Sequence, residues 1–104
     1  MILGLGTDGH TASLFPGEPE VHNTEARALY VPPKDDREAR LTLTVPTLSR
    51  AKQTVVVAFG KEKAAPLQSV FSVKGDIATT PARIVRDFEG GLTWVIDKDA
   101  ASTS

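Results

Sequence analysis

The sequence predicts an α/β fold in which a mostly parallel β-sheet is flanked by helices. Short runs of apolar and β-branched residues alternate with segments of helical composition, which is the pattern of layered α/β proteins. One run, "TVVVAF" at 54–59, is apolar throughout and is typical of a central strand covered on both faces. We therefore assign Val55 to Val57, Phe59 and Trp94 to the core.

The first half of the chain is predicted to form three strands and a short helix. "MILGL" at 1–5 ends a buried strand, and 6–17 form a loop with at most one helical turn. "ALYV" at 28–31 is an extended run that two prolines stop. "RLTLTV" at 40–45 alternates as a strand does, and "PTLSRA" at 46–51 begins with a proline suited to the first helical position.

The second half continues the alternation after the central strand. "KEKAAPLQSVF" at 61–71 is helical in composition, and Pro66 is expected to restrict or kink that helix. A further short helix is predicted at 82–88, followed by a last strand, "LTWVID", at 92–97. The polar tail at 99–104 is expected to fray.

Composition excludes several classes of protein. With 104 residues, of which 40% are hydrophobic and 24% charged, the chain is at most one ordinary globular domain. The net charge of −1 gives no electrostatic case for nucleic-acid binding. No apolar run approaches the roughly 18 residues of a membrane helix, and no signal peptide is visible. Cysteine is absent, which excludes disulfides and thiolate chemistry and suits a cytoplasmic protein.

The strand-like run at Met1 has nothing ahead of it, although parallel strands are normally flanked by neighbours. We therefore expect residues 1–104 to be a single, partial domain, the second half of a larger α/β unit.

The stretch "GLGTDGHTASLFPG" at 4–17 has the glycine spacing of a dinucleotide-binding fingerprint. That fingerprint needs a full strand before it, a long helix after it and an acidic residue about 20 positions on. Only three residues precede Gly4, and Pro16 and Gly17 end any helix within about two turns. Glu25 lies near the required distance but precedes the next strand-like run. The dinucleotide interpretation therefore fails.

A catalytic interpretation of the same loop fits better. Gly6 and Gly9 allow a tight backbone whose amides can point at an anion, and Asp8 can fix the loop by accepting from backbone amides. His10 would follow the carboxyl end of a strand, where α/β sheets bind ligands, and could act as a general base. The alternative, that His10 caps a helix or packs against Phe15, stays open on spacing alone.

The loop resembles the signature of the 6-phosphogluconolactonases, which is close to G-x-G-x-D-G-H-T-A-S-L-F-P. The resemblance continues in order through "PPKDDREARLTLTVPTLSRA", "VVVAFGKEKAAPL", "PARIV" and "WVIDKDAA", and so covers essentially the whole chain. It implies the C-terminal portion of a Rossmann-like fold of the sugar-phosphate isomerase and lactonase type. Family members are a little over twice as long.

The resemblance implies hydrolysis of 6-phospho-D-glucono-1,5-lactone to 6-phospho-D-gluconate in the oxidative pentose phosphate route, without metal or other cofactor. His10 matches the histidine taken as the base that activates water, and Asp8 shapes the loop. Amides near Gly6 and Gly9 could bind the oxyanion. The hydroxyl of Thr11 could bind the substrate, although capping a short helix is its more ordinary use.

Cations are expected where the substrate phosphate binds. Lys34 matches the lysine of the family's P-K segment, and Arg40 matches the arginine that opens the R-x-T-L-T strand. The intervening sequence is more acidic than in the family, which makes Arg37 a competing candidate. Ser13 could also bind a substrate hydroxyl or cap a helix, and His22 is expected to be an exposed loop residue.

Two other functions remain open at this stage. One is a related glucosamine-6-phosphate deaminase or sugar-phosphate isomerase, which T-A-S-L-F-P disfavours. The other is a non-catalytic half-domain that works only with a complementary polypeptide. The sequence does not indicate an oligomeric state.

Overall fold

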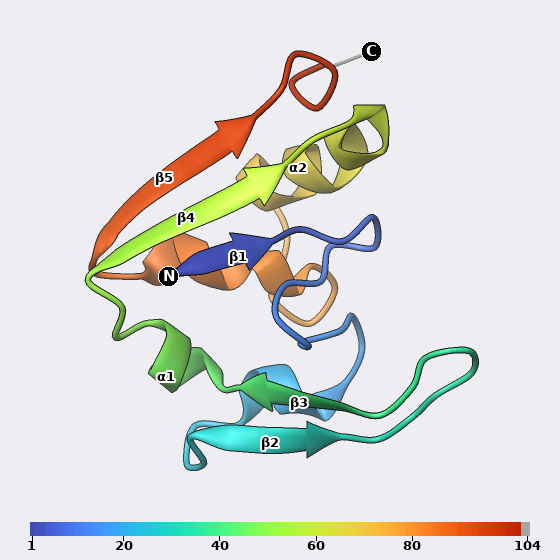
Figure 1. Cartoon of the computed structure of the whole chain (residues 1–104), viewed down its shortest axis with the longest axis vertical. Coiled ribbons are helices and arrows are strands. Elements are labelled where there is room, and N and C mark those ends of the chain that lie inside the picture. The colour runs from blue at the N-terminus through green and yellow to red at the C-terminus, as the bar shows by residue number, and fades with distance from the viewer. Residues whose placement is uncertain (103–104) are drawn as a thin grey trace.

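The computed structural model describes residues 1–102. Its main sheet has three parallel strands in the order β1–β4–β5, formed by Ile2–Gly4, Gln53–Ala58 and Gly91–Ile96 (Figure 1). Strand β4 is therefore central, as the apolar run at 54–59 predicted, but the expectation that both of its faces are covered is not met within residues 1–102. The carboxyl ends of β1 and β4 lie side by side, since Gly4 pairs with Val57. Residues that follow these two strands consequently meet at one edge of the sheet.

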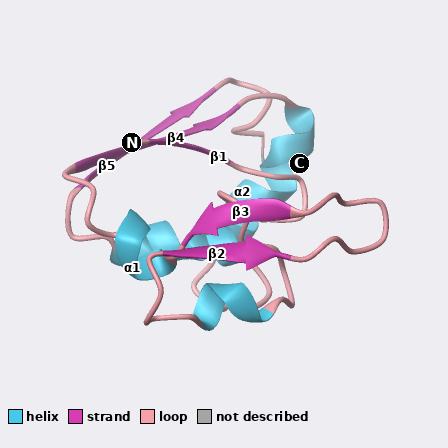
Figure 2. Cartoon of the chain, turned by 60° about the horizontal axis from the view of Figure 1, so that its bottom comes forward, coloured by secondary structure: helices cyan, strands magenta, loops and turns pink. Residues whose placement is uncertain are grey.

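Strands β2 (Ala28–Val31) and β3 (Arg40–Leu43) form a separate antiparallel sheet. The sequence predicted both strands but not that they pair with each other in a sheet of their own. Their connection, residues 32–39, is shorter than the dozen or more residues of a parallel crossover, so the two strands form a hairpin. In Figure 2 this hairpin lies apart from the main sheet, with helices between them.

The predicted helices form, but several are single turns or 3₁₀ helices. Helix α1 is Val45–Leu48 with its proline at the start, and the 3₁₀ turn η2, Lys61–Lys63, leads into α2, Ala64–Phe71. Pro66 lies in the first turn of α2, where an amide has no partner within the helix, so a proline fits there. The remaining 3₁₀ helices are η1, Pro19–His22, which the sequence did not predict, and η3, Pro81–Asp87, in place of the expected helix at 82–88.

Two arginines close the C-terminal end of α2. The Arg83 guanidinium is nearly buried and donates to the carbonyls of Ser69, Val70 and Ser72. Arg86 donates to two of the same carbonyls. These carbonyls lack partners within the helix, so the arginines satisfy them and place positive charge at the negative end of the helix dipole.

The core lies between the main sheet and the helices, in two clusters that both contact Trp94. One cluster is centred on Leu3, Val56 and Ile84, and the other on Ala58 and Leu67. The inner face of the sheet thus packs against the helices, and the assignment of Trp94 and Val56 to the core is confirmed.

The outer face of the sheet is open in the part of the chain that the structure describes. All its helices lie on one side of the sheet (Figure 2). Ile2 is 76% exposed, and Val55 and Val57 are only partly buried. The expectation that Phe59 is a core residue is wrong, since it is 52% exposed. It follows the end of β4, and alternation directs it away from the inner face that Ala58 occupies.

The expectation of a frayed tail is wrong for its first residues. Ala100 is buried in the second cluster, and its amide donates to the Asp97 carboxylate at 2.9 Å. The same carboxylate accepts from the amide of Gly60 at 3.1 Å, which joins the end of β5 to the end of β4. Residues 103–104 of the tail lie outside the described residues.

No helix within residues 1–102 has the length and apolar character needed to cross a lipid bilayer.

Candidate active site

The loop after β1 folds back on itself through its own backbone. The Gly6 amide donates to the His10 carbonyl at 2.8 Å, and the Gly9 amide donates to the Gly6 carbonyl at 3.0 Å. A side chain at Gly6 would overlap the His10 ring, and Gly9 has a φ of +91° and lies against Thr80. Ala82 of η3 donates to the Gly9 carbonyl at 2.9 Å, which anchors the loop to the helix layer. Both glycine amides are therefore used to build the loop, and the expectation that they point at an anion is not met in this conformation.

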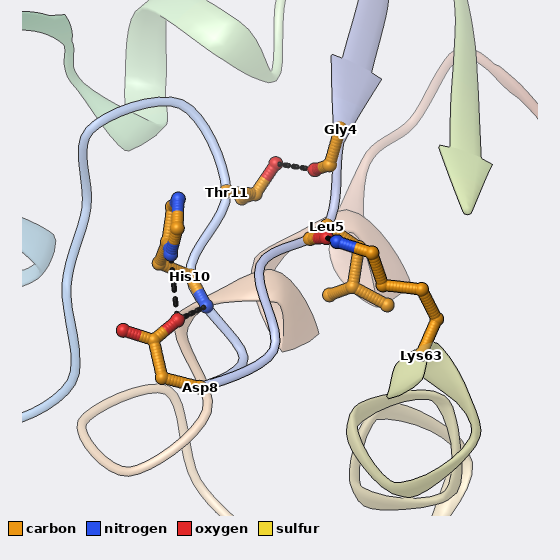
Figure 3. A network of polar contacts seen from close by, with 6 residues as sticks. All are labelled: Gly4, Leu5, Asp8, His10, Thr11 and Lys63. Atoms are coloured by element: carbon orange, nitrogen blue, oxygen red, sulfur yellow. Dashed lines mark hydrogen bonds and ion pairs between the residues drawn. The ribbon is translucent and has the colours of Figure 1, made fainter. Parts of the chain in front are cut away.

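Asp8 holds His10 by two contacts to one carboxylate oxygen. Oδ1 accepts from the His10 backbone amide at 3.0 Å and lies 2.6 Å from Nδ1 of the ring (Figure 3). Partial burial of Asp8 raises the pKa of its carboxyl, but the hydrogen bonds from His10 outweigh burial and hold that pKa below its ordinary value of 3.8. An ionised Asp8 favours the tautomer with the proton on Nδ1, which leaves Nε2 free to accept a proton.

His10 lines an open cavity of about 380 Å³ at the β1 edge of the sheet. The cavity also contains Lys63, whose ammonium donates to the Leu5 carbonyl (Figure 3). Lys63 was not among the candidate site residues predicted from the sequence. The sequence feature that could have identified it is its position shortly after β4. Strands β1 and β4 end side by side, so the residues that follow them lie close together. The other lining residues are Ile2, Leu3, Gly4, Leu5, Gly6, Thr11 and Ala12.

Thr11 and Ser13, the hydroxyl residues that the sequence proposed as substrate contacts, have structural partners. Thr11 is 1% exposed, and its hydroxyl donates to the Gly4 carbonyl at 2.8 Å. The Ser13 amide donates to the Thr42 hydroxyl of β3 at 3.1 Å. Neither caps a helix, because residues 6–17 contain none. Thr11 instead ties the loop to β1, and Ser13 ties it to the hairpin.

The three cations expected at the phosphate lie on the hairpin rather than in the cavity. The Lys34 ammonium is 2.7 Å from the Glu18 carboxylate, a contact that lowers the pKa of Glu18 and raises that of Lys34. The Arg37 guanidinium lies 4.1 Å from the centre of the Phe15 ring. Arg40 is exposed on β3. The structure thus brings His10, Asp8 and Thr11 together with Lys63, and leaves Lys34 and Arg40 outside the group.

His10 also packs against Phe15, with ring centres 4.6 Å apart and planes at 37°. The packing interpretation of His10 and the catalytic one are therefore compatible. His22 is exposed as expected, at the end of η1. Within residues 1–102, no three histidine, aspartate or glutamate side chains are grouped in a way that could hold a metal ion.

The chain is similar to known proteins over nearly its whole length. A family model described as "Glucosamine-6-phosphate isomerases/6-phosphogluconolactonase" matches residues 1–94. The 6-phosphogluconolactonase of Synechocystis is 38% identical over 96% of this chain and 40% of its own length. The rat 6-phosphogluconolactonase is 39% identical over 97% of this chain and 39% of its own length. The chain thus spans about two fifths of the length of these curated relatives.

Solved structures agree with the sequence relatives. The 6-phosphogluconolactonase of Leishmania guyanensis superposes with a TM-score of 0.83 at 31% identity, over 98% of this chain and 40% of that one. The Trypanosoma brucei enzyme gives 0.82 at 31% identity, over 96% and 40%. A monomeric glucosamine-6-phosphate deaminase gives 0.76 at 21% identity, over 100% and 47%, which shows a common fold. From its sequence, its fold and the loop that holds His10, this chain belongs to the family of glucosamine-6-phosphate isomerases and 6-phosphogluconolactonases.

Proposed function

We propose that this chain is the water-activating part of a 6-phosphogluconolactonase, which hydrolyses 6-phospho-D-glucono-1,5-lactone to 6-phospho-D-gluconate. The observation that supports this most directly is the Asp8–His10 pair at the wall of an open cavity. The named relatives with this activity match 96% or more of the chain at 38–39% identity. We further propose that residues 1–104 form part of a single domain, and that the reaction occurs in the cytoplasm.

His10 is the general base of the proposed reaction. Nε2 takes a proton from a water molecule as the water oxygen bonds to the lactone carbonyl carbon, while Asp8 stabilises the imidazolium that forms. The tetrahedral intermediate then expels the ring oxygen, which receives the proton back from His10. The ring-opened product is the carboxylic acid, which ionises near neutral pH.

Anionic groups of the substrate and intermediate need positive or donor groups nearby. The amides of Gly6 and Gly9 are used within the loop, so they contribute by shaping it. Lys63 is a cation in the same cavity as His10, and we assign it to an anionic group of the substrate. We keep Lys34 and Arg40 as candidates for the phosphate, although both lie on the hairpin outside the cavity.

The test measures 6-phosphogluconate formation above the spontaneous opening of the lactone. The chain is assayed alone and in a chimera, in which it replaces the matching segment of the Synechocystis enzyme. We expect His10→Ala to lower the enzymatic rate by about 10²- to 10⁴-fold. The matched control is His22→Ala, an exposed histidine outside the cavity, which should leave the rate unchanged.

Activity of either form that depends on His10 supports the proposal. A folded chimera that stays at the spontaneous rate, beside an active parent enzyme, would refute it. Release of ammonia from glucosamine 6-phosphate by that same chimera would assign the chain to the deaminase branch instead.

A further inference from the structure

The Phe15 ring contacts both the proposed base and a cation from the hairpin. Its centre is 4.6 Å from that of the His10 imidazole and 4.1 Å from Cζ of Arg37. The residues come from two separate segments, the loop after β1 and the turn between β2 and β3. We propose that Phe15 and Arg37 are positioning residues for His10, an inference that rests on the lactonase function proposed above.

The Asp8 contact alone leaves the ring of His10 weakly restrained. The side chains of His10 and Asp8 are 32% and 50% exposed, so water competes for their hydrogen bond. One hydrogen bond at Nδ1 also permits the ring to tilt about that contact. Phe15 packs against the imidazole and restricts this tilt. The ring therefore keeps Nε2 directed away from Asp8, the orientation of His10 that Figure 3 shows.

Arg37 is held over Phe15 by the geometry of the hairpin tip. Lys34 and Arg37 exchange backbone hydrogen bonds of 3.1 and 2.9 Å, which closes a tight turn with Asp35 at a φ of +54°. The Arg37 guanidinium donates to the Pro32 carbonyl at 3.2 Å. The ion pair of Lys34 with Glu18 fixes the same tip to the segment just after the loop.

Placing the Arg37 guanidinium against the Phe15 ring leaves one of its nitrogens without a hydrogen bond. Arg37 Nε is buried and has no hydrogen-bond partner among the described residues. Such a group is unfavourable unless another contact compensates, and the attraction between a cation and an aromatic face is a contact of that kind. Arg37 therefore steadies Phe15, and Phe15 steadies His10.

Kinetics of the active form, chain or chimera, provide the first test. We expect Phe15→Leu to lower kcat about tenfold and Arg37→Gln to lower it about two- to fivefold, with KM changed less than about twofold. Because Arg37 acts through Phe15, the double variant should be no slower than Phe15→Leu alone. The matched control is Arg50→Gln, an exposed arginine outside the cavity, which should match the wild type.

The kinetic alternative is that Arg37 binds the substrate phosphate directly. Arg37→Gln would then raise KM, and its effect would multiply with that of Phe15→Leu. Either result would overturn the inference.

Nuclear magnetic resonance of the imidazole protons gives a second readout that needs no turnover. The chain has two histidines, so exposed His22 is an internal reference for His10. We expect Arg37→Gln to shift the His10 ring protons and leave those of His22 in place, because the Phe15 ring moves relative to His10. Unchanged His10 resonances would overturn the positioning role even if the lactonase activity were established. If the His10 resonances shift in a protein that has no lactonase activity, the Phe15–Arg37 contact still positions His10. In that case the proposed function is rejected and the positioning role is not.

Discussion

The Thr11 hydroxyl has two possible roles: it holds the loop to β1, or it binds the substrate. A substitution that removes the hydroxyl distinguishes them. Thr11→Val keeps the shape of the side chain but removes the donor to the Gly4 carbonyl, 2.8 Å away in a site that is 1% exposed. Loss of a buried hydrogen-bond partner costs about 1–3 kcal/mol. Gly4 itself is exposed, so water can partly replace the hydroxyl, and we expect the free energy of unfolding to fall by about 1 kcal/mol.

Urea denaturation followed by fluorescence measures this loss. The chain has one tryptophan, Trp94, which contacts both core clusters and so reports on the whole fold. Thr7→Val makes the same chemical change at an exposed position of the loop and should stay within about 0.5 kcal/mol of the wild type. If Thr11→Val left stability unchanged but raised KM, the hydroxyl would be a substrate contact and our reasoning would be wrong.

Three further predictions concern charged side chains. Asp8→Asn should lower kcat about 10- to 100-fold, because the amide no longer favours the Nδ1 proton on His10; the lactone assay measures this. Asp97 has a pKa below 3.8, chiefly through the hydrogen bond from the Ala100 amide. Its stabilising contribution is therefore present above pH 3.8 and is lost as pH falls through its folded-state pKa. The thermal midpoint of Asp97→Asn should consequently fall less than that of the wild type as pH is lowered below 3.8. Arg83→Met should reduce the free energy of unfolding by about 2 kcal/mol in urea titrations, since three carbonyls lose a donor and two keep one from a second arginine. A loss below about 0.5 kcal/mol would show that water replaces the guanidinium.

Local patterns were sufficient to predict most strands. The apolar, β-branched run at 54–59 predicted β4, and two prolines after 28–31 marked the end of β2. The partner of each strand depends on the length of the connection as well as on its composition. The short segment at 32–39 makes β2 and β3 a hairpin, and the alternation of strands with helices did not reveal this.

The candidate site was predicted where neighbours in sequence are neighbours in space. Asp8 and His10 are two residues apart, and their contact follows from a tight glycine loop. Lys63 comes from another strand end, and the Phe15–Arg37 contact joins two loops, so both depend on tertiary packing that a linear motif does not encode. The burial of Phe59 was predicted wrongly, because the apolar composition of the run at 54–59 does not indicate which face of the sheet is covered.

Because the outer face of the main sheet is open, the measured stability of this chain depends on the concentration of whatever binds there. Ile2 and Val95 expose apolar surface there, and β1 is an edge strand of the sheet. Any polypeptide that binds this side of the folded chain, and not the unfolded one, raises the unfolding free energy by an amount set by its concentration relative to its Kd. The melting temperature of the chain is then a property of the mixture in which it is measured.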